Sequence, residues 1–190
     1  LEEELKKTEG GMRKMLVSEA LETPRVTRIL PRGNWMDDSG EIVQPAVPEF
    51  LQKEMWNVDG RASRLDLAKW ILHKDNPLTA RSTMNRVWRL FFGRGLSPNV
   101  IDLGGQGEVP THPKLLDWLA ADFRDGGWDM KKMVKKIVSS QVYLQQSEVS
   151  SFLREKDPSN SLLARQGRWR VDAEFVRDGA LKISDLLNDE

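Results

Sequence analysis

The segment from Asn76 to Ala120 constrains the fold of this chain most strongly. It contains NPLTARSTMNRVWRLFFGRGL, then the glycine-dense stretch LGGQGEVPTHP, then KLLDWLA. Its first part carries apolar residues at i, i+3, i+4 and i+7, which is the period of a helix with one buried face: Met84, Val87, Trp88 and Phe91. The last part offers a second apolar stripe, formed by Leu115, Leu116, Leu119 and Phe123. Two such stripes joined by a short connection predict a pair of helices packed face to face.

Terminal signals place the other helices. Ser63 with Asp66 three residues later is a variant of the capping box and predicts a helix up to His73, with Leu65, Ala68, Ile71 and Leu72 on its inner face. We expect Thr79 to cap the next helix and Gly93 to end it. A third helix is predicted from Thr111 to Gly126, with Pro113 in its first turn. Asp129 is the predicted cap of a fourth helix, which turns Met130, Met133, Val134, Ile137 and Val138 inward and its lysines to water. A last helix, near Asp172, aligns Ala173, Val176, Ala180, Ile183 and Leu187.

The N-terminal part has a different character. Residues 1–9 are typical of the end of a helix, which Gly10 and Gly11 would stop. Between Met15 and Phe50, short β-rich runs alternate with prolines and glycines that break any helical period, and we expect a turn at Asp37–Gly40. The predicted fold is therefore mainly α: about five helices in residues 61–190, preceded by an extended or β-hairpin arm in residues 1–60.

Composition excludes several classes of function. Lys plus Arg equal Asp plus Glu at 29 each, so bulk charge gives no reason to expect binding to nucleic acid or to an anionic membrane. No apolar run reaches membrane-spanning length. The chain has no cysteine and only two histidines, so we predict neither a metal site nor a cofactor within it. Seven tryptophans indicate large flat anchors in a core or an interface. We place Trp88, Trp118 and Trp128 in the core, with a platform for a ligand as the alternative.

One face of the helix before Gly93 is polar. Arg81, Asn85 and Arg89 follow one another at four-residue spacing, so they share a face that we call the polar stripe. With Arg86 and Arg94 nearby, its guanidinium groups suit bidentate binding of a carboxylate, phosphate or sulfate. A solvated face, or arginines paired with acids of a neighbouring helix, is the commoner explanation of such a pattern.

The glycine-dense loop offers two further candidates. Backbone amides around Gln106 and Gly107 precede a helix N-terminus and resemble an anion cradle, although an ordinary glycine turn fits equally and the ending of a Walker loop is missing. Glu108 and His112 are the candidate acid and base of a catalytic site, or with further carboxylates part of a metal site. Because the loop returns over the helix, we expect Glu108 to meet a guanidinium of the polar stripe and to act as a structural clasp.

The segment from Gly167 to Asp178, GRWRVDAEFVRD, interleaves arginines and a tryptophan with acids. Nucleic-acid binders mix arginine and aromatic residues in this way, but they also carry a basic excess that this chain does not have. We therefore favour a salt-bridged helix start that docks near the polar stripe.

Several long motifs in order resemble one known family. They include RGNWMD, QPAVPEFL, RLDLAKWIL, NRVWRLFFGRGL, GGQGEVPTHP and ARQGRWRVDAEFVRDGAL. They resemble the C-terminal domain of large planctomycete-type proteins that carry a planctomycete cytochrome c domain upstream. That domain is of unknown function, so the resemblance carries over no catalytic residue; its Asn-Arg-x-Trp motif falls on Asn85, Arg86 and Trp88.

The resemblance also implies a setting. It implies an exported protein, periplasmic or at the cell surface, with haem c in a preceding domain; this chain has no Cys-x-x-Cys-His segment to attach haem. It further implies that the partners are the upstream domains of the same polypeptide and a sulfatase-like protein. Since the chain opens at Leu1, we expect it to be a piece of such a protein.

Two functions follow as hypotheses. The first is a binding and assembly module of a larger exported protein. The second is an enzyme that acts on an envelope component or polysaccharide and is coupled to the upstream cytochrome c domain, with Glu108 and His112 in a cleft. Convergence of Arg81, Asn85, Glu108 and His112 on an open pocket would favour the enzyme, whereas buried and mutually bonded side chains would favour the module.

Overall fold

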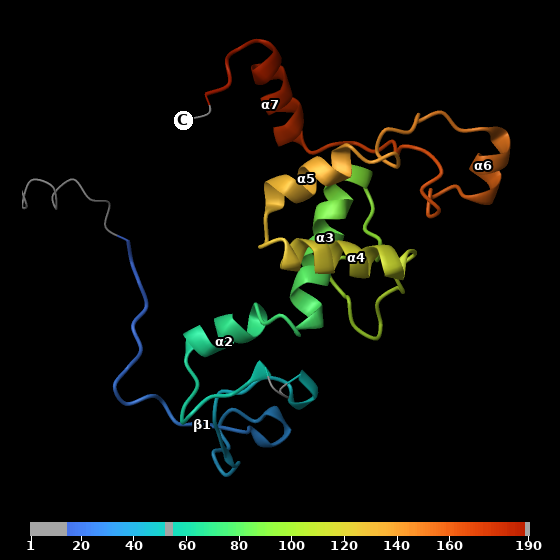
Figure 1. Ribbon diagram of the computed structural model, residues 1–190. Coiled ribbons are helices and arrows are strands. Elements are labelled where there is room, and N and C mark those ends of the chain that lie inside the picture. The colour runs from blue at the N-terminus through green and yellow to red at the C-terminus, as the bar shows by residue number, and fades with distance from the viewer. Residues whose placement is uncertain (1–14, 52–54, 189–190) are drawn as a thin grey trace, which may run out of the picture.

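The computed structural model describes residues 15–51 and 55–188, and these form a mainly helical structure (Figure 1). The helices are α2 (Arg64–Ile71), α3 (Pro77–Phe92), α4 (Pro113–Asp125), α5 (Met130–Val138), α6 (Ser151–Lys156) and α7 (Ala173–Ile183). Two short 3-10 helices, η1 (Pro31–Gly33) and η2 (Glu49–Leu51), belong to the N-terminal arm. The predicted fold class is confirmed. The helix end that we expected in residues 1–9 lies outside the described residues.

The arm contains a minimal β-hairpin. Strand β1 (Thr27–Arg28) pairs antiparallel with β2 (Ile42–Val43), with Thr27 opposite Val43. The predicted turn region Asp37–Gly40 lies in the connection between them, where Asp37 accepts a 3.0 Å hydrogen bond from the amide of Ser39. Gly40 is required there, because a Cβ at this position would lie 1.9 Å from the carbonyl oxygen of Ile29.

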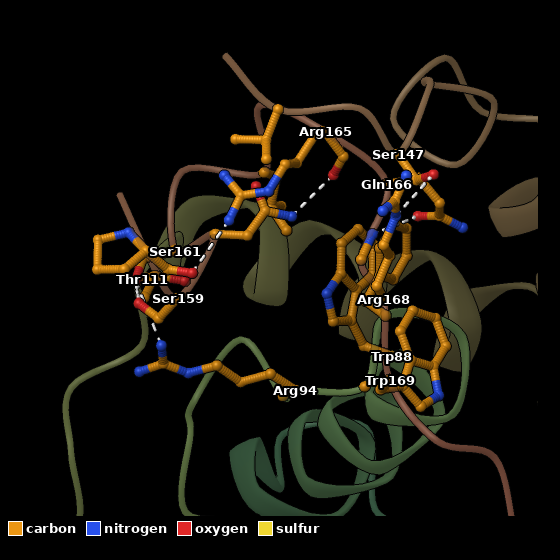
Figure 2. Close-up of a pocket in the computed structure, with 18 of the residues that line it drawn as sticks. Trp88, Arg94, Thr111, Ser147, Ser159, Ser161, Arg165, Gln166, Arg168 and Trp169 are labelled. Carbon is orange, nitrogen blue, oxygen red and sulfur yellow. Dashed lines mark hydrogen bonds between the residues drawn. The ribbon is translucent and has the colours of Figure 1, made fainter. Parts of the chain in front are cut away.

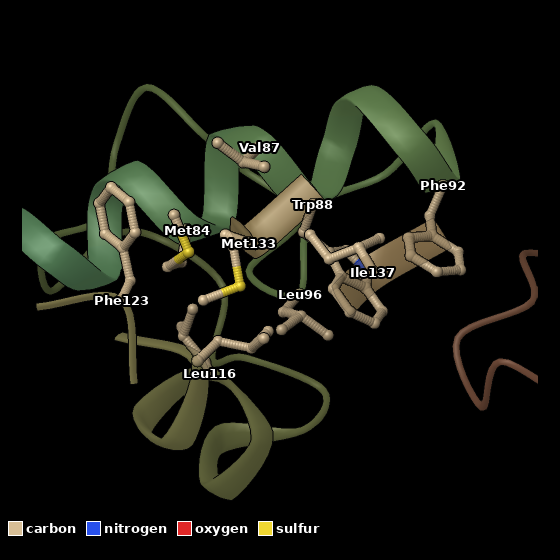
Figure 3. Packing of buried hydrophobic residues seen from close by; sticks show 10 residues of the cluster. Met84, Val87, Trp88, Phe92, Leu96, Leu116, Phe123, Met133 and Ile137 are labelled. Atoms are coloured by element: carbon tan, nitrogen blue, oxygen red, sulfur yellow. The ribbon is translucent and has the colours of Figure 1, made fainter. Parts of the chain in front are cut away.

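The core lies where α3 packs against α4 and α5 (Figure 3). Trp88 is 4% exposed and stacks on Phe92, with ring centroids 4.1 Å apart. The cluster of buried residues comprises Met84, Val87, Trp88, Phe92, Leu96, Leu116, Leu119, Phe123, Met133 and Ile137. The predicted pairing of the two apolar stripes is thus confirmed, with Phe91 and Leu115 only partly buried at its edge.

Local signals set most helix ends as predicted. Ser63 and Asp66 form the capping box of α2, Gly93 ends α3 in the left-handed conformation (φ 75°), and Asp129 caps α5. Thr79 as the cap of α3 was wrong. The cap is Asn76, whose side chain accepts a 3.0 Å hydrogen bond from the amide of Leu78, and Pro77 takes the first helical position.

Several expected buried faces are exposed. Leu65 of α2 and Leu72 at its C-cap are 63% and 56% exposed, and Ile183 of α7 is 90% exposed. The start of α5 is exposed at Met130, and α6 was not expected. No described helix is long and apolar enough to cross a membrane.

Two predictions about α4 and α5 were also wrong. Trp118 is 53% exposed rather than in the core, and the ammonium group of Lys136 lies 5.0 Å from its ring centroid in a cation–π contact. Lys136 therefore does not simply face water; it is half-buried and donates a 2.5 Å hydrogen bond to Asp122. Trp128 is partly buried against the core, at the edge of Phe123.

Candidate functional site

The polar stripe of α3 does not act as one surface. Arg81 pairs with Asp117 of α4 through a 3.0 Å contact from Nε to the carboxylate, so it joins the two helices. Asn85 is 1% exposed, whereas Arg86 and Arg89 are exposed. The prediction of one exposed polar face was therefore wrong at Asn85, and the reason lies in the chain that follows the helix.

Asn85 fixes that chain by binding its backbone. Its side-chain amide donates to the carbonyl of Ser97 (2.9 Å) and accepts from the amide of Ser97 (2.8 Å). The Ser97 hydroxyl in turn donates to the carbonyl of Glu108 (3.0 Å), and the amide of Thr111 donates to the carbonyl of Leu96 (2.8 Å). The loop between α3 and α4 is thus held by hydrogen bonds to its own backbone groups, made by Asn85 of α3 and by other residues of the loop.

The acid and base candidates of the loop have separate partners. The Glu108 carboxylate lies 3.7 Å from the guanidinium of Arg94, an ion pair longer than a hydrogen bond, and both side chains are partly exposed. The predicted clasp therefore has the wrong partner, since Arg81 is occupied by Asp117. His112 Nδ1 lies 3.1 Å from the hydroxyl of Thr111.

The predicted anion cradle is a tight turn. Gln106 is exposed, and the amide of Gly107 donates a 3.0 Å hydrogen bond to the carbonyl of Gly104. A Cβ at Gly107 would lie 2.2 Å from the carbonyl oxygen of Asp102. The glycine is therefore explained by this close approach within the turn, which supports the simpler of the two interpretations.

An open hollow of about 470 Å³ lies beside this loop (Figure 2). One wall is the end of α3 and the residues up to Leu96, and the other is formed mainly by residues 158–169. Four arginines line it, namely Arg94, Arg154, Arg165 and Arg168, and none of the described residues that line it is acidic. Hydroxyl and carboxamide groups complete the polar lining, at Thr111, Ser147, Ser159, Asn160, Ser161 and Gln166. We call this the main hollow.

Three of the four guanidinium groups are held by neutral partners. Arg94 donates to the hydroxyl of Ser161 (3.3 Å) and Arg168 to that of Ser147 (3.1 Å). Arg165 donates to the carbonyls of Asp157 (3.1 Å) and Pro158 (3.0 Å). These bonds orient the positive charges without forming ion pairs. Two acids outside the lining lie nearby: Glu108 beside Arg94, and the buried Asp157, whose carboxyl interacts with the charge of Arg165.

Asp157 shapes the far wall. Its carboxylate is 5% exposed and accepts hydrogen bonds from the amides of Ser161 (2.7 Å) and Leu162 (2.8 Å). Burial raises the pKa of Asp157, but these amides and the charge of Arg165 lower it more, so the pKa lies below its usual 3.8. The ionised carboxylate therefore holds the residues that face the main hollow.

Trp169 separates the main hollow from a neighbour. Its indole lies on two glycines: a Cβ at Gly93 would come 2.7 Å from the ring, and one at Gly167 2.9 Å. Trp169 and Gly93 also line a second, side hollow of about 330 Å³, which includes Arg89, Arg170 and Phe175. The start of α7 thus lies beside Arg89 of the polar stripe, near the place where the sequence led us to expect it.

Sequence reasoning found part of this site. It singled out Arg89, Arg94 and the segment from Gly167 to Asp178, but not Asp157 or the serines at 159 and 161. The available signal was DPSN, in which an Asp followed by Pro, Ser and Asn is typical of a turn fixed by the aspartate side chain. In the described part of the chain, no group of three or more His, Asp or Glu side chains is placed to hold a metal ion.

The fold and the site define a helical domain with a cationic hollow bordered by tryptophan. Residues 63–190 match a family model described as PSD1, protein of unknown function (DUF1553), and the chain belongs to this family. Comparison with curated proteins finds no match, and neither does comparison with solved structures.

Proposed function

We propose that this chain is a binding module and that the main hollow holds an anionic ligand. One observation carries the proposal: four guanidinium groups surround an open hollow whose described lining includes no carboxylate. Exposed arginines usually pair with acids on their own surface, so several that are oriented by hydroxyls and carbonyls retain their charge for a ligand. The volume of the hollow is within the usual range of ligand sites, about 300–1,000 Å³.

The alternative, a catalytic domain, has less support. Arg81, Asn85, Glu108 and His112 do not converge on a pocket: Arg81 and Asn85 are engaged within the fold, and Glu108 and His112 each have another partner. The convergence that would favour the enzyme is therefore absent, and only Asn85 of the four meets the burial that would favour the module. A general base must also lie within hydrogen-bond reach of a bound substrate, and the described lining of the main hollow offers neither a carboxylate nor an imidazole for that role.

Titration with sodium sulfate at constant ionic strength tests the proposal. Amide shifts in two-dimensional NMR should localise to Ser147, Ser161 and Gly167, and Arg168→Ala should weaken binding at least about threefold. Arg86→Ala is the matched control, because it removes one exposed arginine of α3 that lines neither hollow. Equal weakening by both variants, or shifts spread evenly over the surface, would contradict the proposal.

The assembly role rests on a different observation. Exposed apolar side chains run along α7, where Phe175, Val176 and Ile183 are 61%, 60% and 90% exposed. We take the upstream domains of the same exported polypeptide as the partner of this face. Hydrogen exchange of α7 tests the assignment: its amides should be more protected in the longer polypeptide than in this chain, and unchanged exchange would refute it.

A further inference from the structure

The two hollows beside Trp169 share a wall. Gly93 and Trp169 line both of them, so the ring of Trp169 stands between two compartments of about 470 and 330 Å³. Trp169 is 38% exposed, and the indole packs closely over the backbone at Gly93 and Gly167. Since neither glycine has a side chain, the indole of Trp169 packs directly on the backbone, and part of its surface stays exposed to solvent.

Both compartments carry positive charge. The main hollow has four arginines and no acid in its described lining, and the side hollow has Arg89 and Arg170 with one acid, Asp172. A single small anion would occupy one of these places only. Two cationic compartments separated by an aromatic ring suit a longer ligand that repeats its negative charge along its length.

The neutral polar groups restrict the chemistry of that ligand. Six hydroxyl or carboxamide side chains line the main hollow, more than the number of its arginines. Each hydroxyl has one donor and two acceptor positions. Ser147, which accepts from Arg168, therefore retains capacity for a ligand, and Ser161, which accepts from Arg94 and shares a 2.8 Å hydrogen bond with the hydroxyl of Ser159, retains one position. A ligand rich in hydroxyl groups uses this lining, whereas a polymer that offers only charged groups would leave much of it unused.

The aromatic ring adds a second restriction. An indole face carries partial negative charge and attracts C–H groups with partial positive charge, such as those on one face of a pyranose ring. Single-stranded nucleic acids instead stack successive bases on several aromatic side chains, within a strongly basic groove. This chain has zero formal net charge, and Trp169 is the one aromatic residue common to the two hollows.

We infer that the main and side hollows form one groove for an acidic oligosaccharide, with a sugar ring stacked on Trp169 and carboxylate or sulfate groups bound by arginines on either side. This inference rests on the proposed function, because it takes the main hollow as the anion site and extends it across Trp169. It adds the class of ligand and the second compartment.

Calorimetric titration with chondroitin sulfate fragments tests the inference. A hexasaccharide should bind at least about tenfold more tightly than a disaccharide, because only the longer chain reaches both compartments. Trp169→Ala should lower hexasaccharide affinity about tenfold, and Arg170→Ala should lower it while leaving sulfate binding unchanged. Arg177→Ala is the matched control, since it removes an exposed arginine of α7 that lines neither hollow. Arg170→Ala tests the groove even if Trp169→Ala fails to fold, because it leaves the indole and its contacts with Gly93 and Gly167 intact.

The outcomes separate the two proposals. If sulfate binds and responds to Arg168→Ala but hexasaccharide and disaccharide bind equally, the oligosaccharide groove is refuted and the anion site stands. If sulfate does not bind at the main hollow, the anion site itself is refuted. Equal binding of neutral cellohexaose would refute the need for charge, and tighter binding of a six-nucleotide oligothymidylate or of hexa-aspartate would refute the saccharide class.

Discussion

Replacing Asn85 tests whether a buried amide holds the loop between α3 and α4. Asn85→Leu keeps the branching and the number of side-chain heavy atoms, so the main change is the loss of the two hydrogen bonds with the backbone of Ser97. Ser97 is 4% exposed, so its amide and carbonyl would be left buried without these partners. At about 1–3 kcal/mol for each unsatisfied group, the variant should lose about 2–6 kcal/mol of unfolding free energy.

Urea denaturation followed by circular dichroism measures this loss directly. For a chain of this size the predicted range corresponds to a fall in Tm of at least about 4 °C. Hydrogen exchange adds a local readout, because the amides of Ser97 and Thr111 should lose protection before those of α3.

Arg86→Ala is the matched control for Asn85→Leu. Arg86 is the next residue of α3 and is exposed, so its removal should change stability by less than about 0.5 kcal/mol. A loss in Asn85→Leu no larger than in this control would refute the claim that the Asn85–Ser97 pair holds the loop.

Three further substitutions probe the core and the walls of the main hollow. Trp88→Ala should cost about 3–5 kcal/mol in urea denaturation, since Trp88 is almost fully buried and stacked on Phe92; a cost below about 1 kcal/mol would show that the core tolerates its loss. Gly93→Ala should destabilise the chain by about 1 kcal/mol or more because of its positive φ, and should raise acrylamide quenching of tryptophan fluorescence by displacing Trp169; unchanged quenching would contradict the packing. The pKa of Asp157 is lowered by folding, so its carboxylate stabilises the fold above about pH 4 and loses this contribution as the pH falls below its usual 3.8. The stability difference between the wild type and Asp157→Asn should therefore be full at pH 6 and shrink below pH 4 in urea titrations, and a difference independent of pH would refute the role of the charge.

The helices and their ends were largely predictable because the interactions that set them are local. The capping box of Ser63 and Asp66, the left-handed Gly93 and the cap at Asp129 each involve residues within one turn. The pairing of α3 with α4 was predictable as well, because the two apolar stripes are joined by a short loop. Where a local rule failed, as at Thr79, a stronger local signal was present in Asn76 and Pro77.

The site was less predictable, since its partners are distant in sequence. Arg94 and Ser161 are 67 positions apart, and nothing near either residue indicates the other. The choice of Asp117 rather than Glu108 as the partner of Arg81 likewise depends on how α4 lies against α3. Residue type and spacing show that a side chain can form a hydrogen bond or an ion pair. They do not show which partner the packing of the helices places beside it.

The sequence by itself thus determined the mainly helical class, most helix boundaries and the apolar faces that meet in the core, because periodicity and capping act over a few residues. Only the tertiary structure decided that Asn85 is buried, that the faces of α2 and α7 are open, and that Arg94, Arg165 and Arg168 surround one hollow. These depend on long-range packing, in which the segment 157–169, shaped by the ionised Asp157, returns to the end of α3.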